Sequence, residues 1–496
     1  MTGTASRAAP GPRQASGPVR LVRAVARGGV AFLRRLDAAL LLSILVVLLV
    51  GIPSVLIFQP LGGAGTPANM VGMMLLLWWI ASRLVPRFGV STKGQPVRVA
   101  VSILFAAVLL SYGSAMLHGW GMPIGLQERT AFGSGSLQLD TVAQVTAKEI
   151  KAADRGLLSL AAWAGIALVA ADGISTRRRL DLVLHTLTAM GAFMAFLGAL
   201  QYFFAVDIAS YFTIPGLHPN GDFGGIAFRS VRRVQSTAMH PIEFGVVLSA
   251  ILPIAISRAM YSPPGKRWLP WTYAMIIALA IPMSVSRSAI LAFGVAAVIL
   301  FLGWNGRQQI AGFVVFCFFG IAMKVLVHGL LGTVRSLFIN LGNDPSIQGR
   351  TRDYAVVSQL FHERPLLGRG FFTFIPVLYR TFDNAYLLAL VELGAIGLVA
   401  LILVFLIGIL TARGARRAAP DARGRDLGQA LAAAIAAIAV SAATFDMLSF
   451  PMAATLSFLL LGCSGALWRL HRQDLGLRAR PAAAVPLERE LQAVRS

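Results

Sequence analysis

Long apolar stretches, separated by short polar segments, run along most of the chain. A helix needs about 20 apolar residues to cross a bilayer, because the hydrocarbon core is about 30 Å thick. Twelve stretches of about that length predict spanning helices. They lie at 38–58, 66–85, 98–118, 156–174, 181–205, 241–260, 269–284, 287–304, 309–328, 385–411, 427–445 and 448–468. The pattern therefore predicts an all-α, polytopic membrane protein.

Composition agrees with lipid as the main solvent. Hydrophobic residues make up 56% of the 496 residues and charged residues 13%, and the mean hydropathy is +0.72, which is too apolar for a soluble domain of this size. Residues 1–36 are rich in Arg, Ala, Gly and Pro and hold no apolar segment with a cleavage site. We expect a disordered basic cytoplasmic tail at 1–36, a first span that is itself the export signal, a transmembrane domain at 37–470 and a second cytoplasmic tail at 471–496.

The placement of Lys and Arg predicts the orientation. Twelve spans put both termini on one side, and with that side cytoplasmic the inner segments hold 29 of the 44 Lys and Arg residues. Cytoplasmic loops carry such an excess. We therefore expect a multi-pass protein of the inner (plasma) membrane with both termini in the cytoplasm. The net charge of +23 follows from this topology and from contact with the anionic leaflet. No basic patch is interleaved with aromatic residues as in nucleic-acid-binding proteins, so we expect no nucleic acid partner.

Cysteine chemistry does not contribute to the predicted function. Cys317 and Cys463 both fall inside predicted spans, and the sequence has no CxxC motif or Cys/His cluster. A thiol inside a span acts as a small apolar side chain. We expect no disulfide, no metal site and no cofactor.

Three predicted outer connections are long, at 119–155, 206–240 and 329–384, whereas the inner loops are short. Long loops on a rigid scaffold often carry binding and catalytic residues. The first is charge-balanced, which favours a solvated loop with an amphipathic helix near 141–155. We therefore expect the chemistry in the second loop and in the large loop between the ninth and tenth spans.

The second loop brings together Arg229, Arg232 and Arg233, followed by His240 where the next span begins. Three arginines on the outer side oppose the usual charge bias. A guanidinium presents a rigid fork of donors that matches phosphate oxygens, so the cluster predicts an anion site. The alternative is that these arginines pair with Asp222, Glu243 or lipid headgroups.

Arg287 is a further isolated cation, in a turn of a few residues between two apolar spans. An ionisable group near the outer interface is costly and is by default a functional hypothesis. The alternative is that its side chain extends to lipid headgroups.

The large loop holds the densest polar pattern. It includes Arg350 in GRTRDY, Arg369 in ERPLLGRGFFTF, and the pair Asp383 and Asn384 before the tenth span. Asp383 has a plain interpretation as a helix N-cap. A carboxylate at the outer edge, facing arginines, is also typical of a general base for a sugar hydroxyl.

Four stretches in this order resemble the O-antigen ligase and O-antigen polymerase superfamily of polytopic membrane glycan enzymes. They are RVQSTAMHP, SVSRSAI, ERPLLGRGFFTF and DNAYLLALVELGAIG. The resemblance implies a metal-independent, inverting glycosyl transfer on the outer face. The donor is a saccharide on a polyprenyl (undecaprenyl) pyrophosphate, and the acceptor is a sugar hydroxyl of lipid A core or of another lipid-linked repeat unit. Arg233 and Arg287 occupy the places of the family's pyrophosphate-binding arginines, with Arg229 and Arg232 as neighbours.

The chain departs from the ligase branch at one position. Asp383 stands where that branch has His, next to Asn384. This favours a polymerase of exopolysaccharide, capsule or O-antigen over an O-antigen:lipid A core ligase. The base stays open between Asp383 and His240, while Arg287 supports the leaving group and Arg350, Arg369 and Asn384 are expected to bind substrate. A flippase and a chain-length regulator of the same pathway are the expected partners. A flippase or other transporter of lipid-linked sugars, and a non-catalytic scaffold, are the alternatives from other classes.

Overall fold

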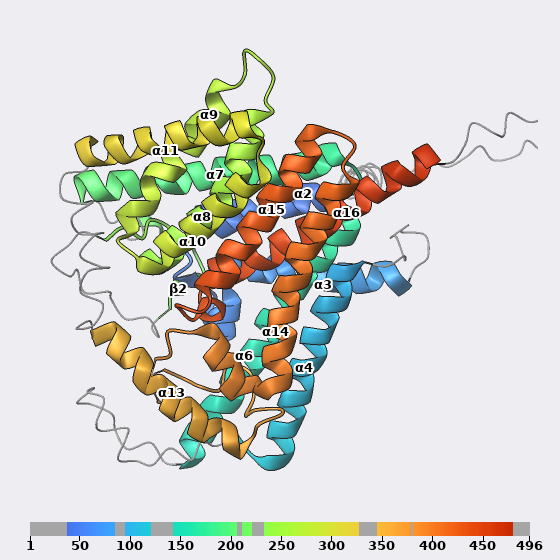
Figure 1. Ribbon diagram of the computed structural model, residues 1–496. Helices are drawn as coiled ribbons and strands as arrows, with labels where there is room; N and C mark the ends of the chain where they lie inside the picture. The colour runs from blue at the N-terminus through green and yellow to red at the C-terminus, as the bar shows by residue number, and fades with distance from the viewer. Residues whose placement is uncertain are drawn as a thin grey trace, which may run out of the picture.

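The computed structural model describes residues 37–84, 95–120, 142–205, 211–220, 233–326, 345–376, 378–379 and 381–479. Most of them lie in helices (Figure 1). The α-helices are α2 (Ala38–Gly51), α3 (Pro67–Leu84), α4 (Pro96–His118), α6 (Val142–Gly173), α7 (Arg177–Phe204), α8 (Pro241–Met260), α9 (Trp268–Ala280), α10 (Arg287–Gly303), α11 (Gly306–Leu326), α13 (Pro345–Glu363), α14 (Ala385–Ala418), α15 (Ala422–Ser441) and α16 (Pro451–Ala479). Short elements are the 3-10 helices η1 (Gln59–Gly65), η5 (Ile281–Ser284) and η7 (Met447–Ser449), and the antiparallel pair β1 (Leu56–Ile57) and β2 (His218–Pro219).

A helix lies at each of the twelve predicted spans. Within the described residues, six helices are long and apolar enough to cross a membrane, and η1 with α3, bent by 81°, would make a seventh. Three further helices are apolar but shorter, namely Ala38–Gly51, Trp268–Ser284 and Arg287–Gly303. The protein is thus a helical, polytopic membrane protein. Twelve crossings, and the side on which each loop lies, stay predictions. The tail at 1–36 lies outside the described residues, and α16 extends nine residues into the segment predicted as the C-terminal tail.

Several helix boundaries differ from the predicted ones, among them those of α6 and α2. The amphipathic segment near 141–155 and the span that follows it form one helix, α6, of 32 residues. The first span was predicted to reach residue 58, but α2 ends at Gly51 and Ile52 is extended (φ −96°, ψ 133°). Pro53 explains this end, because a proline disfavours helical backbone in the residue before it.

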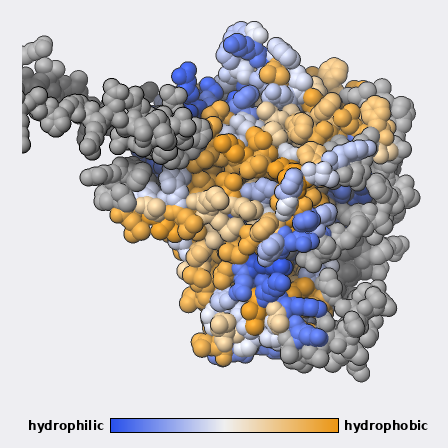
Figure 2. All heavy atoms as spheres, turned by 180° about the vertical axis from the view of Figure 1, so that it is seen from behind, coloured by the Kyte–Doolittle hydropathy of each residue, from blue (hydrophilic) through white to orange (hydrophobic). Residues whose placement is uncertain are grey.

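The core of the bundle is built around α16, of which 94% of the apolar window is buried. It packs against α6, α14 and α15. Small residues allow the close approach: a Cβ added at Gly462 would lie 2.6 Å from the carbonyl oxygen of Ala167. Outer helices instead expose apolar side chains, such as Phe313 (62%) and Phe318 (67%) on α11. Figure 2 shows broad apolar areas on one face of the molecule, as a lipid-facing surface requires.

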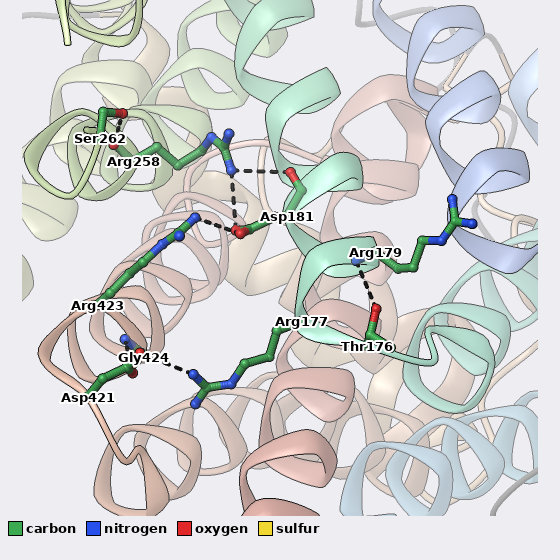
Figure 3. Close-up of polar contacts among 9 residues, drawn as sticks. All are labelled: Thr176, Arg177, Arg179, Asp181, Arg258, Ser262, Asp421, Arg423 and Gly424. Carbon is green, nitrogen blue, oxygen red and sulfur yellow. Dashed lines mark hydrogen bonds and ion pairs between the residues drawn. The ribbon is translucent and has the colours of Figure 1, made fainter. Parts of the chain in front are cut away.

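One end of the bundle is tied together by ion pairs (Figure 3). Asp181 on α7 binds Arg258 at the end of α8 (3.4 Å) and Arg423 at the start of α15 (2.6 Å). Arg177 pairs with Asp421 at 3.2 Å. These residues lie in or next to the segments that the distribution of Lys and Arg assigns to the cytoplasmic side. Parts of the chain that are far apart in the sequence thus meet at one end of the bundle. We name this end the basic end.

A second ion-pair group lies among α3, α4 and α6. The side chain of Asp172 is 1% exposed and accepts from Arg83 at 2.6 Å and from Arg98 at 2.8 Å. The indole nitrogen of Trp79 donates to the same carboxylate at 3.0 Å. Asp172 therefore joins the end of α3 to the start of α4.

Candidate functional site

Of the predicted site residues that the structure describes, His240, Arg287, Asp383 and Asn384 lie at helix ends that point away from the basic end. Helix α8 ends there with Arg258, so its first turn, after His240, lies at the other end. The end of α10 is bound to α14, because Arg416 donates to the carbonyl oxygen of Gly303 (2.7 Å), which puts Arg287 at the start of α10 far from the basic end. The start of α14 and the end of α15 face the same way, since these helices are joined near Asp421.

The segment 233–240, which we name the arginine loop, lies against the start of α10. The Nε of Arg233 donates to the carbonyl oxygen of Ser284 (3.4 Å), and the backbone N–H of Val234 donates to that of Met283 (3.3 Å). Arg287 is the first residue of α10 and Ser286 is its N-cap. Arg233 and Arg287 therefore belong to adjoining backbone segments. Arg229 and Arg232 lie outside the described residues.

The position of Arg287 favours an anion. A helix N-terminus carries partial positive charge, so an arginine there is repelled by the helix dipole. A second arginine, Arg233, is held by the neighbouring segment. Both side chains are half-buried. Two guanidiniums beside a helix N-terminus are an arrangement that phosphate oxygens stabilise.

His240 is the N-cap of α8. Its Nδ1 accepts a hydrogen bond from the backbone N–H of Ile242 at 3.1 Å. Burial, followed by the charge of Arg233, lowers the pKa of His240 to about 4. The ring is therefore neutral near pH 7, with its proton on Nε2, because Nδ1 is used as an acceptor. This geometry suits hydrogen-bond donation from Nε2 better than proton abstraction.

The cap of α14 is Asn384 and not Asp383. The Oδ1 of Asn384 accepts from the backbone N–H groups of Tyr386 (3.0 Å) and Leu387 (3.2 Å). The plain interpretation of Asp383 as the N-cap is therefore wrong. Asp383 is half-buried, one residue before the cap.

The turn between α15 and α16, residues 442–450, contacts the starts of α8, α10 and α14. The backbone N–H of Ala385 donates to the carbonyl oxygens of Ala442 (2.9 Å) and Phe445 (3.3 Å). The Oγ of Ser288, next to Arg287, donates to the carbonyl oxygen of Thr444 (3.4 Å). The ring of Phe450 lies 5.9 Å from that of His240. This turn joins the starts of α8, α10 and α14, and we name it the junction turn.

Asp446 in the junction turn is a further site candidate, and it lies outside the four sequence motifs. Burial raises its pKa to about 6, against hydrogen bonds from Ser449 that lower the pKa, and the nearby Asp383 carboxylate adds to the rise. A nearby carboxylate disfavours the charged form of Asp446, which is why Asp383 raises its pKa. The sequence signal was an acidic residue between two apolar spans, which is functional by default.

Two of the four sequence motifs interlock at a break in α14. Gly394 has a left-handed φ of 66°, which interrupts the helix. The carbonyl oxygen of Glu392 accepts from the backbone N–H groups of Arg369 (2.9 Å) and Gly370 (2.8 Å), and the N–H of Ala395 donates to the carbonyl of Pro365 (2.8 Å). The segment ERPLLGRGFFTF thus satisfies the groups that the break leaves without helical partners. We name this contact the α14 clasp.

A small cavity lies between the clasp and the junction turn. It is lined by Glu392, Asp446 and Ser449, together with the rings of Phe371 and Phe372 and four apolar side chains. Its space of about 10 Å³ is close to what one water molecule needs. The carboxylates of Asp446 and Glu392 therefore border a common space.

Arg369 has structural partners. Its side chain is 3% exposed and forms an ion pair with Glu363. The neighbouring Arg364 donates to the carbonyl oxygens of His118 and Gly119, each at 2.7 Å, and so caps the end of α4. A role of Arg369 in substrate binding stays a prediction. Arg350 lies in α13, which runs beside the starts of α6 and α14 (Figure 1), and its side chain lies outside the described residues.

The described part of the chain contains no group of three or more His, Cys, Asp or Glu residues that could hold a metal ion. The Glu392 carboxylate accepts from the backbone N–H of Phe374 at 3.0 Å, and Asp446 lies close enough to Ser449 and Asp383 for both to shift its pKa. The arrangement can bind an anion at Arg233 and Arg287 and can accept a proton at Asp383 or Asp446.

Fold and site define a polytopic helical membrane protein with a charged site at one end of its bundle. Residues 272–402, about a quarter of the chain, match the family model described as O-antigen ligase (Wzy_C). This match confirms the resemblance and supports the O-antigen ligase and polymerase superfamily, and with it a membrane enzyme that acts on lipid-linked glycans. The matched segment includes Arg287, Asp383 and the α14 clasp, whereas the arginine loop and the junction turn lie outside it. No curated protein matches the chain.

Proposed function

We propose that the protein is a membrane glycosyltransferase that polymerises lipid-linked repeat units of exopolysaccharide, capsule or O-antigen on the outer face of the inner membrane. The donor is a saccharide on a polyprenyl pyrophosphate and the acceptor is a sugar hydroxyl of another unit. The observation that carries this proposal is the junction turn, which holds the starts of α8, α10 and α14 together. Arginines and carboxylates from separate motifs thereby share one region.

The arginines supply the electrostatic part of the reaction. As the bond between the sugar C1 and the pyrophosphate oxygen breaks, the bonding electrons leave with the pyrophosphate and its negative charge increases. Fixed guanidiniums of Arg233 and Arg287 stabilise that charge without reorganisation. We place Arg229 and Arg232 beside them on the same anion. This use of arginine makes the proposed transfer independent of a metal.

The carboxylates supply the base. Asp383 accepts the proton of the acceptor hydroxyl, whose oxygen attacks C1 from the side opposite the pyrophosphate, and the configuration at C1 inverts. Asp446 supports this role, because its pKa of about 6 lets it take up or release a proton near neutral pH. We assign to His240 a hydrogen bond donated from Nε2 to substrate, and we keep Asn384, Arg350 and Arg369 as candidate glycan contacts.

The proposed orientation puts the basic end in the cytoplasm together with both termini. Its ion-paired segments come from the inner side of the charge pattern, so the site at the opposite helix ends faces outward. A flippase that delivers the lipid-linked unit and a chain-length regulator are the proposed partners. Transfer to lipid A core is a second candidate, which the description of the matched family as O-antigen ligase favours.

The experiment is complementation of a null strain of the host with wild type, Arg287→Ala and Asp383→Asn. Two residues at the other end give matched controls: Arg417→Ala at an exposed position, and Asp474→Asn at a half-buried carboxylate that pairs with Arg177 at 3.5 Å. Membrane levels are checked by immunoblot and surface glycans are separated on a gel. We expect unpolymerised units with both site variants and normal glycan with both controls. Unattached but polymerised glycan would instead identify the ligase. Normal glycan from both site variants would overturn the proposal and favour the transporter or scaffold.

A further inference from the structure

Glu243, in the first turn of α8, is completely buried and uses both carboxylate oxygens (0% exposed). Its Oε2 accepts from the backbone N–H of Met239 (2.8 Å) and from the Oγ of Ser54 (3.2 Å). Its Oε1 accepts from the backbone N–H groups of Met452 (2.8 Å) and Ala453 (3.1 Å). One carboxylate therefore joins the arginine loop, the segment after α2 and the start of α16.

The two donors on α16 are the ones that an N-cap normally satisfies. Helix α16 begins at Pro451, so Met452 and Ala453 are its second and third residues. The N–H groups at these positions bond to the side-chain oxygen of a Ser, Thr, Asp or Asn N-cap. The cap position of α16 is held by Phe450, which has no such oxygen. Glu243 supplies the missing acceptor from another helix.

The side chain of Phe450 serves a different contact. Its ring lies 5.9 Å from the ring of His240 and 5.4 Å from that of Phe445. A capping residue at position 450 would lose this contact with the arginine loop. The chain therefore separates the two tasks: Phe450 packs against His240, and Glu243 caps α16.

The charge of Glu243 fits this task. A carboxylate at a helix N-terminus is stabilised by the helix dipole, and four hydrogen bonds replace the water that burial removes. The same carboxylate lies three residues after His240. It fixes the start of α16, and with it the junction turn that carries Asp446, against the arginine loop that carries Arg233.

We propose that Glu243 is a positioning residue for glycosyl transfer, which holds the arginine loop and the junction turn in one relative position. Arg233 and Asp446 then act on the same bound substrate. The inference rests on the proposed function. The inference goes beyond the proposed function, because Glu243 belongs neither to the anion site nor to the proton-accepting carboxylates and yet sets their relative position.

The test is Glu243→Gln, which keeps the size of the side chain. The amide has only one acceptor oxygen, so its NH₂ group faces either the arginine-loop donors or the α16 donors and breaks that contact. Ser54→Ala is the matched control, because it removes one donor to the same carboxylate and leaves both backbone segments bound. Purified variants in liposomes are given lipid-linked repeat units extracted from the null strain. Polymer formation is measured per molecule of monodisperse protein against donor concentration.

We expect Glu243→Gln to lower the maximal rate at least 10-fold, with a half-saturating donor concentration within about threefold of wild type. Ser54→Ala should stay within twofold in both quantities. A purely structural role would lower only the yield or thermal stability of the protein, so a normal rate per folded molecule would overturn the proposal. If Glu243→Gln does not accumulate, Glu243→Asp, which keeps the charge on a shorter side chain, is subjected to the same comparison and the same criterion.

The failure of this inference is distinct from failure of the proposed function. If Arg287→Ala abolishes polymer formation while Glu243→Gln and Glu243→Asp are normal per folded molecule, the function stands and the positioning role is wrong. If Arg287→Ala is itself normal, the proposed function is wrong.

Discussion

Gly394→Ala is expected to open the α14 clasp. Gly394 has φ 66° and ψ −168°, a backbone conformation that is nearly exclusive to glycine. A Cβ added there would lie 2.4 Å from the carbonyl carbon and oxygen of Leu366 and 2.6 Å from the backbone nitrogen of Leu367. All three are backbone atoms, so a side-chain rotation cannot relieve the clash, and the segment 365–367 must move away from α14.

The cost can be worked from two contributions. Alanine in this backbone region costs about 1–3 kcal/mol. Separation also breaks the bonds from Ala395 to Pro365 (2.8 Å) and from Ile396 to Leu366 (3.2 Å), each worth about 1 kcal/mol. The expected destabilisation is thus about 3–5 kcal/mol. Gly294→Ala is the control, since a Cβ at Gly294 of α10 meets nothing within 4 Å and alanine favours a helix by up to about 1 kcal/mol.

The assay is the fraction of detergent-solubilised protein that stays monodisperse after heating, together with the level in membranes. We expect Gly394→Ala to lose several degrees of thermal stability and Gly294→Ala to be unchanged or slightly more stable. Equal melting of Gly394→Ala, Gly294→Ala and wild type would refute the clasp as a constraint on α14.

Substitutions at three other residues test separate parts of the structure. Arg287→Ala should reduce polymer formation about 10²- to 10³-fold, as loss of a preorganised charge does at other sites, and Arg287→Lys should recover part of it, both measured per molecule in liposomes. Asp446→Asn should be less active than wild type yet more stable at pH 8. The folded-state pKa of Asp446 is raised, so this carboxyl contributes stability below its unfolded pKa of 3.8, and that stability is lost as the pH rises through about 6. Melting temperatures at pH 4 and pH 8 check this, and a variant less stable than wild type at pH 8 would contradict it. Asp172→Asn should destabilise the protein by about 2 kcal/mol, since it leaves Arg83 and Arg98 without their carboxylate, while the rate per folded molecule stays normal.

The helices and the main charged motifs were predictable because both signals are local. Apolar runs located a helix at each predicted span. The arginines of the site were noticeable because they lie in predicted outer loops, where Lys and Arg are usually scarce. Asp383 and Arg287 could be singled out in the same way, from their position at the edge of an apolar run.

Contacts between distant segments could not be predicted. Whether Asp383 or Asn384 caps α14 depends on side-chain geometry that both residues permit. The cap of α16 comes from Glu243, 208 residues before Pro451 in the sequence, and no local capping motif announces it. The α14 clasp likewise pairs backbone groups of two motifs, so nothing in the sequence around Gly394 indicates its left-handed φ of 66°. Such pairings are set by tertiary packing and have no signature in either segment alone.

The most direct test of the account is an assay with purified protein in liposomes, with lipid-linked repeat units extracted from the null strain and EDTA present. Product length is read on a gel and by mass spectrometry for wild type, Arg287→Ala and Asp383→Asn. We expect longer lipid-linked chains with wild type and, over the same time, little or none with either variant. No elongation by folded wild type, or equal elongation by all three, would contradict it.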